Sequence, residues 1–479
     1  MVLKKLDRIP ISVGAWQAYV ELAGEFAEYV LSSKFRSLDP RTVKEMKARV
    51  VDAIGCAIGA YAEKPIAIAR KAALGLRKGG PSTLLGTKYR SSPDLATFLN
   101  GFMLRYFDYN DTYLSREPGH PSDNIAPCLA VGEAEDASGR EFLTAAVAAY
   151  EIQCRLCDSA DLRHRGWDHV NYGLVSSSLA AAKLMGLSQA EATQAVNIAL
   201  NGHIAMRQVR AGELSAWKGA SFANAARNGV FAAVLAREGL SGPAPIFEGE
   251  MGFFRQVSGT FRIDPDNFGG RKGRYKVCET YVKYWPAEYH AQSAIWAALE
   301  LRPMIKDIGG VESVTVETHE AAYSILGRDF EKWAPKTKET ADHSLPFIVA
   351  VALLKGRVDN NSYKKAGLRD PRVLRLAAKV KVIEDPGLSA KYPAGGMPNR
   401  ITVKTMGEKE LMAQVNVPRG HPANPMTKDE LEGKFLRLVG KYLGRVEAKK
   451  ALNRLWKIDD EKSVGDVLTL LQVRSRWNP

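Results

Sequence analysis

The stretch DYNDTYLSREPGHPSDN, residues 108 to 124, combines residue types that could move protons. Asp108 and Thr112 stand four residues apart, so they would share a face if the preceding helix continued for another turn. His120 comes shortly before Ser122, which we expect to cap the helix that follows. A helix N-terminus disfavours imidazolium, so this position predicts a neutral His120 that can act as a base.

Asp108 raises a second expectation about this stretch. The apolar pattern before it predicts a helix that ends near Phe107, which would leave the carboxylate against the negative end of the helix dipole. Asp108 could then accept an N–H from His120 and fix the tautomer of its ring. The alternative interpretation is an ordinary interhelical loop that carries a surface histidine.

Further candidate residues lie at the starts of segments rich in small side chains. They are His169 in GWDHVNYG, Lys218 in SAWKGAS and His290 in PAEYHAQS. Arg207 and Arg210 in MRQVR could clamp substrate carboxylates, because a guanidinium group matches carboxylate geometry. Each of these residues taken alone is more often structural, and a solvated helix face is the alternative for the two arginines.

The sequence indicates no metal site and no cofactor. Cys154 and Cys157 form a CxxC pair inside an alanine-rich helical pattern, without the second pair of ligands that zinc or an iron–sulfur cluster needs. A structural role for both thiols is therefore expected. The glycines of RKGGPSTLLG are not followed by the lysine and hydroxyl residue of a phosphate-binding loop.

Composition bounds the function class and the compartment. The 479 residues are 46% hydrophobic and 25% charged, which is ordinary for a globular protein. No window of about 18 residues is purely apolar, so no membrane span is expected. The N-terminal stretch MVLKKLDRIPISVG lacks the features of a secretion signal, and five scattered cysteines do not make a disulfide framework, so a cytoplasmic protein is expected.

The net charge of +14 comes from basic residues spread along the whole chain. A nucleic-acid-binding surface would concentrate this charge and interleave it with aromatic residues, so no nucleic-acid partner is expected. A solvated surface is the favoured interpretation of this excess. Such a field would also steer a small anionic substrate toward the protein.

The elements that must position these residues fall into three parts. Residues 15 to about 268 are almost continuously helical in pattern, with Ser92 capping a helix that starts at Pro93, and with a capping box of Ser188 and Glu191. Residues 1–270 are thus expected to form the first part of an all-helical domain.

The pattern changes after residue 270. Period-two alternation in VESVTVETH and RITVKTM, and the segment AAKVKVIED, predict strands between glycine- and proline-rich loops. Residues 271–424 should therefore form a smaller inserted α+β lid domain. A second capping box, Thr427 with Glu430, opens the helices of residues 425–479, which should rejoin the helical domain. The predicted fold class is mainly α.

The motifs DYNDT, GHPSDN, GWDHVNYG, YWPAEYHAQSA and GHPANPM occur in this order at suitable spacing. Together they resemble the MmgE/PrpD family, which includes 2-methylcitrate dehydratases, cis-aconitate decarboxylases and an iminodisuccinate epimerase. The resemblance covers the chain from about residue 18 to residue 475. The motifs are specific for the family and less specific for the reaction.

This resemblance implies a helical domain with an α+β lid, a homodimer formed through helices, and a cleft active site that works without metal or cofactor. A lid with loop-like boundaries would have to open to admit substrate. The site residues that the resemblance carries over, with His169 matching less closely than the others, are Asp108, Thr112, His120, His169, Lys218 and His290. Ser122, Arg207 and Arg210 join them as candidate substrate-binding residues.

The reaction that we expect from this resemblance is a dehydration. Phe347 stands where the decarboxylases have a tyrosine, although Lys218 matches the decarboxylase branch. We expect a hydro-lyase that acts on a 2-methylcitrate-like hydroxy-tricarboxylate in propionate metabolism, with His120 and either His290 or His169 as acid and base. The alternatives are a decarboxylase or an epimerase of a related acid, or a non-catalytic protein that binds anions or nucleic acid.

Overall fold

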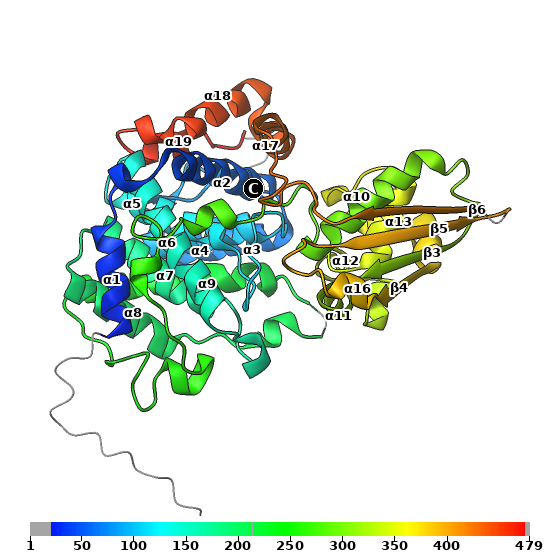
Figure 1. Cartoon of the computed structure of the whole chain (residues 1–479). Coiled ribbons are helices and arrows are strands. Elements are labelled where there is room, and N and C mark those ends of the chain that lie inside the picture. The colour runs from blue at the N-terminus through cyan, green and yellow to red at the C-terminus, as the bar shows by residue number, and fades with distance from the viewer. Residues whose placement is uncertain (1–20, 213, 408, 475–479) are drawn as a thin grey trace, which may run out of the picture.

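The computed structural model describes residues 21–212, 214–407 and 409–474. Figure 1 shows two parts, a large helical body and a smaller lobe built on a four-stranded sheet. The N-terminal stretch in which the sequence predicts no secretion signal lies outside the described residues. Within the described ranges, no helix combines the length and the apolar character that crossing a membrane requires.

Helices dominate both parts, which confirms the mainly α class. The helices of the body are α1 (Leu22–Ser32), α2 (Pro40–Gly59), α3 (Lys64–Leu76), α4 (Pro93–Arg105), α5 (Ile125–Ala134), α6 (Gly139–Ser159), α7 (Asn171–Leu184), α8 (Gln189–Gly202), α9 (Trp217–Arg237), α17 (Lys428–Leu443), α18 (Arg445–Trp456) and α19 (Gly465–Thr469). Those of the lobe are α10 (Gln292–Leu301), α11 (Glu320–Leu326), α12 (Lys338–Ala341), α13 (Leu345–Lys355), α14 (Lys365–Leu368), α15 (Pro371–Ala377) and α16 (Pro386–Ser389).

The strands are short and few. They are β1 (Ser82–Thr83), β2 (Arg90–Ser91), β3 (Val311–Thr318), β4 (Val380–Glu384), β5 (Asn399–Thr405) and β6 (Lys409–Val415). The sequence predicts an all-helical body, but the body also contains the antiparallel pair β1–β2. That prediction is wrong in this detail. The capping boxes at Ser188 and Thr427 are present, and Ser92 precedes a helix that begins at Pro93.

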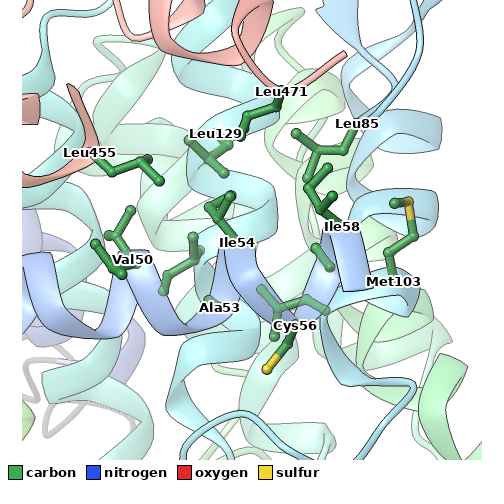
Figure 2. Packing of buried hydrophobic residues seen from close by; sticks show 14 of the residues in the cluster. Val50, Ala53, Ile54, Cys56, Ile58, Leu85, Met103, Leu129, Leu455 and Leu471 are labelled. Carbon is green, nitrogen blue, oxygen red and sulfur yellow. The ribbon is translucent and has the colours of Figure 1, made fainter. Parts of the chain in front are cut away.

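The core of the body is built around α2. Figure 2 shows Ile54 and Ile58 of this helix pointing toward Leu129, Leu85 and Leu471, side chains that are distant in the sequence. The C-terminal helices α17 and α18 pack on α2, and the buried Phe435 fills the space beside Gly55. The last segment of the chain is thus part of the same core.

The lobe is a twisted sheet of order β4-β3-β5-β6, with β3 parallel to β4 and the other neighbours antiparallel. Alternation places Val314, Val316, Ile401 and Val403 on the buried face, where α10 and α13 pack. The three strands predicted from the sequence are present. The domain boundaries at residues 270 and 424 stay a prediction. The segment Lys276–Glu279 packs against the helical body, although it follows residue 270.

Candidate active site

A cleft of about 1220 Å³ lies between the helical body and the lobe. The body contributes the loop after α4, the start of α9, residues 207–212 and Leu214. The lobe contributes the start of α10, the helix α11 and the loop after α16. The predicted site residues that line this cleft are Asp108, Thr112, His120, His169, Arg207, Arg210, Lys218 and His290.

Asp108 is the centre of a buried charge cluster. It has a left-handed backbone (φ 50°) three residues after α4 ends, and its carboxylate accepts from Arg105 at 2.5 Å, Lys218 at 3.0 Å and Lys283 at 2.5 Å. Burial alone would raise the pKa of Asp108, but these three cations hold it well below its usual value. They also outweigh the unfavourable end of the helix dipole, because each is in direct contact with the charge.

His120 is held by groups other than those expected from the sequence. Its Nδ1 lies 2.7 Å from the carbonyl oxygen of Asp111, and its Nε2 lies 2.7 Å from Nη2 of Arg105. This geometry assigns the proton to Nδ1 and the lone pair to Nε2. Asp108 is not the partner that fixes the tautomer, so that expectation is wrong.

The surroundings of His120 favour the neutral ring, but for a reason other than the expected one. Burial, followed by the charges of Arg105 and Lys283, lowers the pKa of His120 well below its usual value. A helix end contributes little, because His120 precedes only the 3₁₀ turn Pro121–Asn124. The helix α5 begins later, at Ile125.

Ser122 does not act as predicted. It lies inside the 3₁₀ turn, is buried, and does not line the cleft. Its backbone N–H donates to the carboxylate of Asp111 at 2.9 Å, and its hydroxyl accepts from Asn110. Pro121 starts the turn one residue too early for Ser122 to cap it. The backbone N–H and the hydroxyl of Ser122 are therefore already used within the protein.

His169 lies beside His120, with 5.7 Å between the two ring centroids. Its Nε2 is 3.0 Å from Nη2 of Arg210, and Arg210 also pairs with the buried Asp168 at 3.2 Å. Burial lowers the pKa of His169 to about 3, so this ring is neutral. Arg207 belongs to the same 3₁₀ turn as Arg210, and both side chains reach the cleft wall.

His290 comes from the lobe and belongs to a chain of three polar groups. Its Nδ1 faces the carboxylate of Glu288 at 2.9 and 3.1 Å, while its Nε2 lies 3.2 Å from the hydroxyl of Tyr392. Burial opposes ionisation of Glu288, but the nearby His290 lowers the pKa of Glu288 to about 2. A carboxylate that stays charged stabilises a proton on the imidazole.

Sequence reasoning missed several residues that complete the cleft. Lys283 stands directly before the motif YWPAEYHAQSA, and Glu288 stands two residues before His290. His343 follows Asp342 in the chain, and its Nδ1 lies 2.6 Å from that carboxylate. An Asp-His dipeptide is a weak signal, since adjacent side chains usually diverge.

His343 extends the charge cluster toward α12. Its Nε2 lies 3.1 Å from Nζ of Lys218, and Lys338 pairs with the buried Asp342 at 2.7 Å. Burial and the charge of Lys218 lower the pKa of His343. The neutral ring of His343 thus contacts the amino group of the buried Lys218.

Three of these groups could in principle hold a metal ion. Ligand atoms of Asp108, Asp342 and His343 all lie within 4.8 Å of one another. The two carboxylates already bind four cationic side chains between them, from residues 105, 218, 283 and 338. Cationic neighbours at these distances disfavour a further positive ion, so the donor set does not fit a resident metal.

The cleft lining is rich in cations. Among the described residues it contains six arginines and three lysines against six carboxylates. Such a wall attracts polyanions, and guanidinium groups bind carboxylates in a bidentate manner. The arrangement suits a small di- or tricarboxylate.

Three side chains from the sequence analysis lie away from the cleft. Phe347 is buried in α13, in the core of the lobe, with its ring 6.4 Å from that of Tyr363, and it does not line the cleft. The difference between this phenylalanine and the tyrosine of the decarboxylases therefore gives no direct information about the cleft. Cys154 and Cys157 are buried in α6, and burial raises the pKa of both thiols, as a structural role requires.

A helical body joined to a small sheet lobe, with a cationic histidine cleft between them, agrees with two matches to family models. The MmgE/PrpD N-terminal domain matches residues 24–266, and the MmgE/PrpD C-terminal domain matches residues 285–458. The chain therefore belongs to the MmgE/PrpD family, as its motifs predict.

The chain is also similar to individual members of this family. It is 32% identical to 2-methylcitrate dehydratase of Cupriavidus necator over 362 residues, which cover 70% of this chain and 72% of that protein. The corresponding enzyme of Escherichia coli K12 is 31% identical over 70% of this chain and 73% of its own length. Alkylcitrate dehydratase phiI of a fungal species is 27% identical over 83% and 84%, respectively.

Proposed function

We propose that this protein is a hydro-lyase that dehydrates a 2-methylcitrate-like hydroxy-tricarboxylate to an enoate. The observation that carries the proposal is the joint lining of one cationic cleft by His120 of the body and His290 of the lobe. The similarity to enzymes named 2-methylcitrate dehydratase and alkylcitrate dehydratase supports it.

Substrate carboxylates would be bound by the cations of the cleft wall. Arg207 and Arg210 lie on one 3₁₀ turn beside His169, where their guanidinium groups can grip a carboxylate. Lys218 and Lys283 are fixed by Asp108 deeper in the cleft. A positive charge held there stabilises the negative charge that develops when a proton leaves the carbon next to a carboxylate.

We assign the base to His120. Its Nδ1–H is used by the carbonyl of Asp111, so its Nε2 is the atom that accepts the proton. Burial and Arg105 keep the ring neutral. Proton transfer requires the contact with Arg105 to give way, which a substrate carboxylate bound to that guanidinium would bring about.

The acid would then come from the lobe. Glu288 holds the Nδ1–H of His290 and stabilises the imidazolium form, so the proton that leaves Nε2 can serve to protonate the leaving hydroxyl. The two proton-transfer groups would stand on opposite parts of the cleft. This arrangement removes the carbon-bound proton on one side and protonates the hydroxyl on the other.

The test is an absorbance assay for the enoate with citrate, 2-methylcitrate and isocitrate as substrates, followed by product analysis. We expect absorbance to rise with at least one of these hydroxy-acids, with no loss of carbon from the product. Release of carbon dioxide would identify a decarboxylase instead. Exchange of stereochemistry without enoate would identify an epimerase, and no conversion would contradict the proposal.

We further propose that residues 271–424 act as a lid, and that the protein is a cytoplasmic homodimer. The residues Trp217 and Phe231 support a partner surface, because both are half exposed on one face of α9, about four turns apart. Light scattering on the purified chain tests the dimer. A monomer at micromolar concentration would contradict it.

A further inference from the structure

The side chains of His290, His319 and Tyr392 form an aromatic cluster in the lobe. The hydroxyl of Tyr392 lies 3.2 Å from Nε2 of His290, and Tyr392 itself lines the cleft. The ring of Tyr392 stacks on that of His319, with 4.2 Å between centroids and 8° between planes. The rings of His319 and His290 are 5.2 Å apart.

His319 is unusual for a buried histidine. It is fully buried at the end of β3, and neither ring nitrogen has a hydrogen-bond partner among the described residues. Burial lowers its pKa to about 3, so the ring is neutral. Leaving two polar atoms unpaired costs stability, and the mechanism above gives this residue no part. The stacking of the His319 ring on the ring of Tyr392 is therefore the contact that can explain a histidine at this position.

We propose that Tyr392 is the catalytic residue that hands a proton to the leaving hydroxyl, and that His319 is a positioning residue that holds the ring of Tyr392 in place. This inference rests on the proposed hydro-lyase function and deepens it. It places Tyr392 between the substrate and the Glu288–His290 pair. His290 then acts through Tyr392 instead of touching the substrate.

The proton balance of this step closes within the cleft. His120 takes the proton from carbon, the electron pair of that bond forms the new double bond, and the carbon–oxygen bond breaks. The departing oxygen takes the proton of the Tyr392 hydroxyl and leaves as water. The phenolate oxygen takes the proton from Nε2 of His290, whose Nδ1–H stays on Glu288. His120 ends protonated and His290 neutral, and exchange with solvent restores both.

The surroundings of Tyr392 suit a hydroxyl that loses its proton only while it receives a second proton from His290. Burial and the charge of Glu288 raise the pKa of Tyr392 to about 12, so the hydroxyl is protonated between turnovers. A bare phenolate would be unstable beside Glu288. Simultaneous transfer from His290 avoids that species, because Nε2 of His290 lies 3.2 Å from the phenol oxygen.

The first experiment compares the wild type with Tyr392→Phe on two substrates. One is the hydroxy-tricarboxylate, and the other carries fluorine in place of the leaving hydroxyl, since fluoride departs without taking a proton. We expect kcat for the hydroxy-acid to fall by about 10²-fold or more, in line with general acid catalysis. The fluorinated substrate should be turned over at nearly the wild-type rate, which also shows that the variant is folded.

Equal losses on both substrates, or no loss on either, would overturn the role of Tyr392. A wild type that converts neither substrate would overturn the hydro-lyase proposal and this inference with it. A second pair of variants tests His319. Because neither of its nitrogens is used, His319→Phe should retain activity on the hydroxy-acid, whereas His319→Ala should lose it and keep activity on the fluorinated substrate. Loss in both His319 variants would contradict the stacking role.

Discussion

The ring of His120 lies against the guanidinium of Arg105, with 2.7 Å between Nε2 of the histidine and Nη2 of the arginine. Arg105 also binds Asp108 at 2.5 Å, so one buried cation joins the proposed base to the central carboxylate. A positive charge at this distance disfavours imidazolium. The contact explains how His120 can remain neutral although the carboxylate of Asp108 lies nearby.

Arg105→Gln should shift the pH profile of kcat/KM. Arg105 lowers the pKa of His120, so removing its charge raises that pKa and moves the acidic limb of the profile to higher pH. Arg105→Lys keeps the charge and should leave the limb close to that of the wild type. Rates from pH 5 to 9, measured beside melting temperatures, test the prediction. An unchanged limb in both variants would mean that Arg105 does not control the base.

Glu288→Gln should impair proton donation. The carboxylate of Glu288 stays ionised, with its pKa lowered to about 2, and it faces Nδ1 of His290. Without that charge the protonated ring of His290 loses a stabilising partner, so kcat should fall by roughly 10²-fold. The control is Glu288→Asp, which retains the charge and should retain more activity. Full activity in the Gln variant would remove His290 from the acid role.

Chelation should leave activity intact. The carboxylates of Asp108 and Asp342 are bound by lysine and arginine side chains, which makes their site unfavourable for an added cation. Prolonged EDTA treatment followed by the enoate assay, with metal content measured in parallel, tests this. Loss of activity that iron or zinc restores would contradict it.

Glu117→Gln should change how stability depends on pH. Glu117 is fully buried, accepts backbone N–H groups from Leu162 and Arg163, and has its pKa raised to about 7 by burial. Since the folded pKa exceeds the unfolded value, this group stabilises the fold at low pH. The contribution is lost as the pH rises through about 7.

The Gln variant does not titrate at this position. Its stability relative to the wild type should therefore improve by roughly 1–3 kcal/mol between pH 5 and pH 8. Unfolding in urea at the two values measures that difference, and any pH-independent effect of the amide cancels. A relative stability that stays constant with pH would show that Glu117 titrates normally.

The helices and most strands follow from local sequence. The capping box of Ser188 and Glu191 and the alternation in residues 311–318 report interactions between near neighbours, so they can be found in the chain itself. The strand β6 was missed, because it lies at the sheet edge with charged and exposed side chains and shows no clear alternation.

The site could be predicted only in part. His120, Lys218 and His290 stand in recognisable motifs, but their partners are set by the fold. Lys283 reaches Asp108 across 175 residues, and His343 reaches Lys218 across 125 residues. Contacts of this kind arise only when the lobe is placed against the helical body. The tautomer of His120 likewise depends on a backbone carbonyl, which carries no sequence signal.

The most direct test of the account is the turnover of His120→Asn on the hydroxy-acid that the wild type converts best, measured beside the melting temperature. The contact of His120 with the carbonyl of Asp111 can be kept by the Asn amide, so stability should change by less than about 1 kcal/mol. We predict that kcat falls by about 10²–10⁴-fold while the protein stays folded. Near-normal turnover by the folded variant would contradict the central claim that His120 is the base.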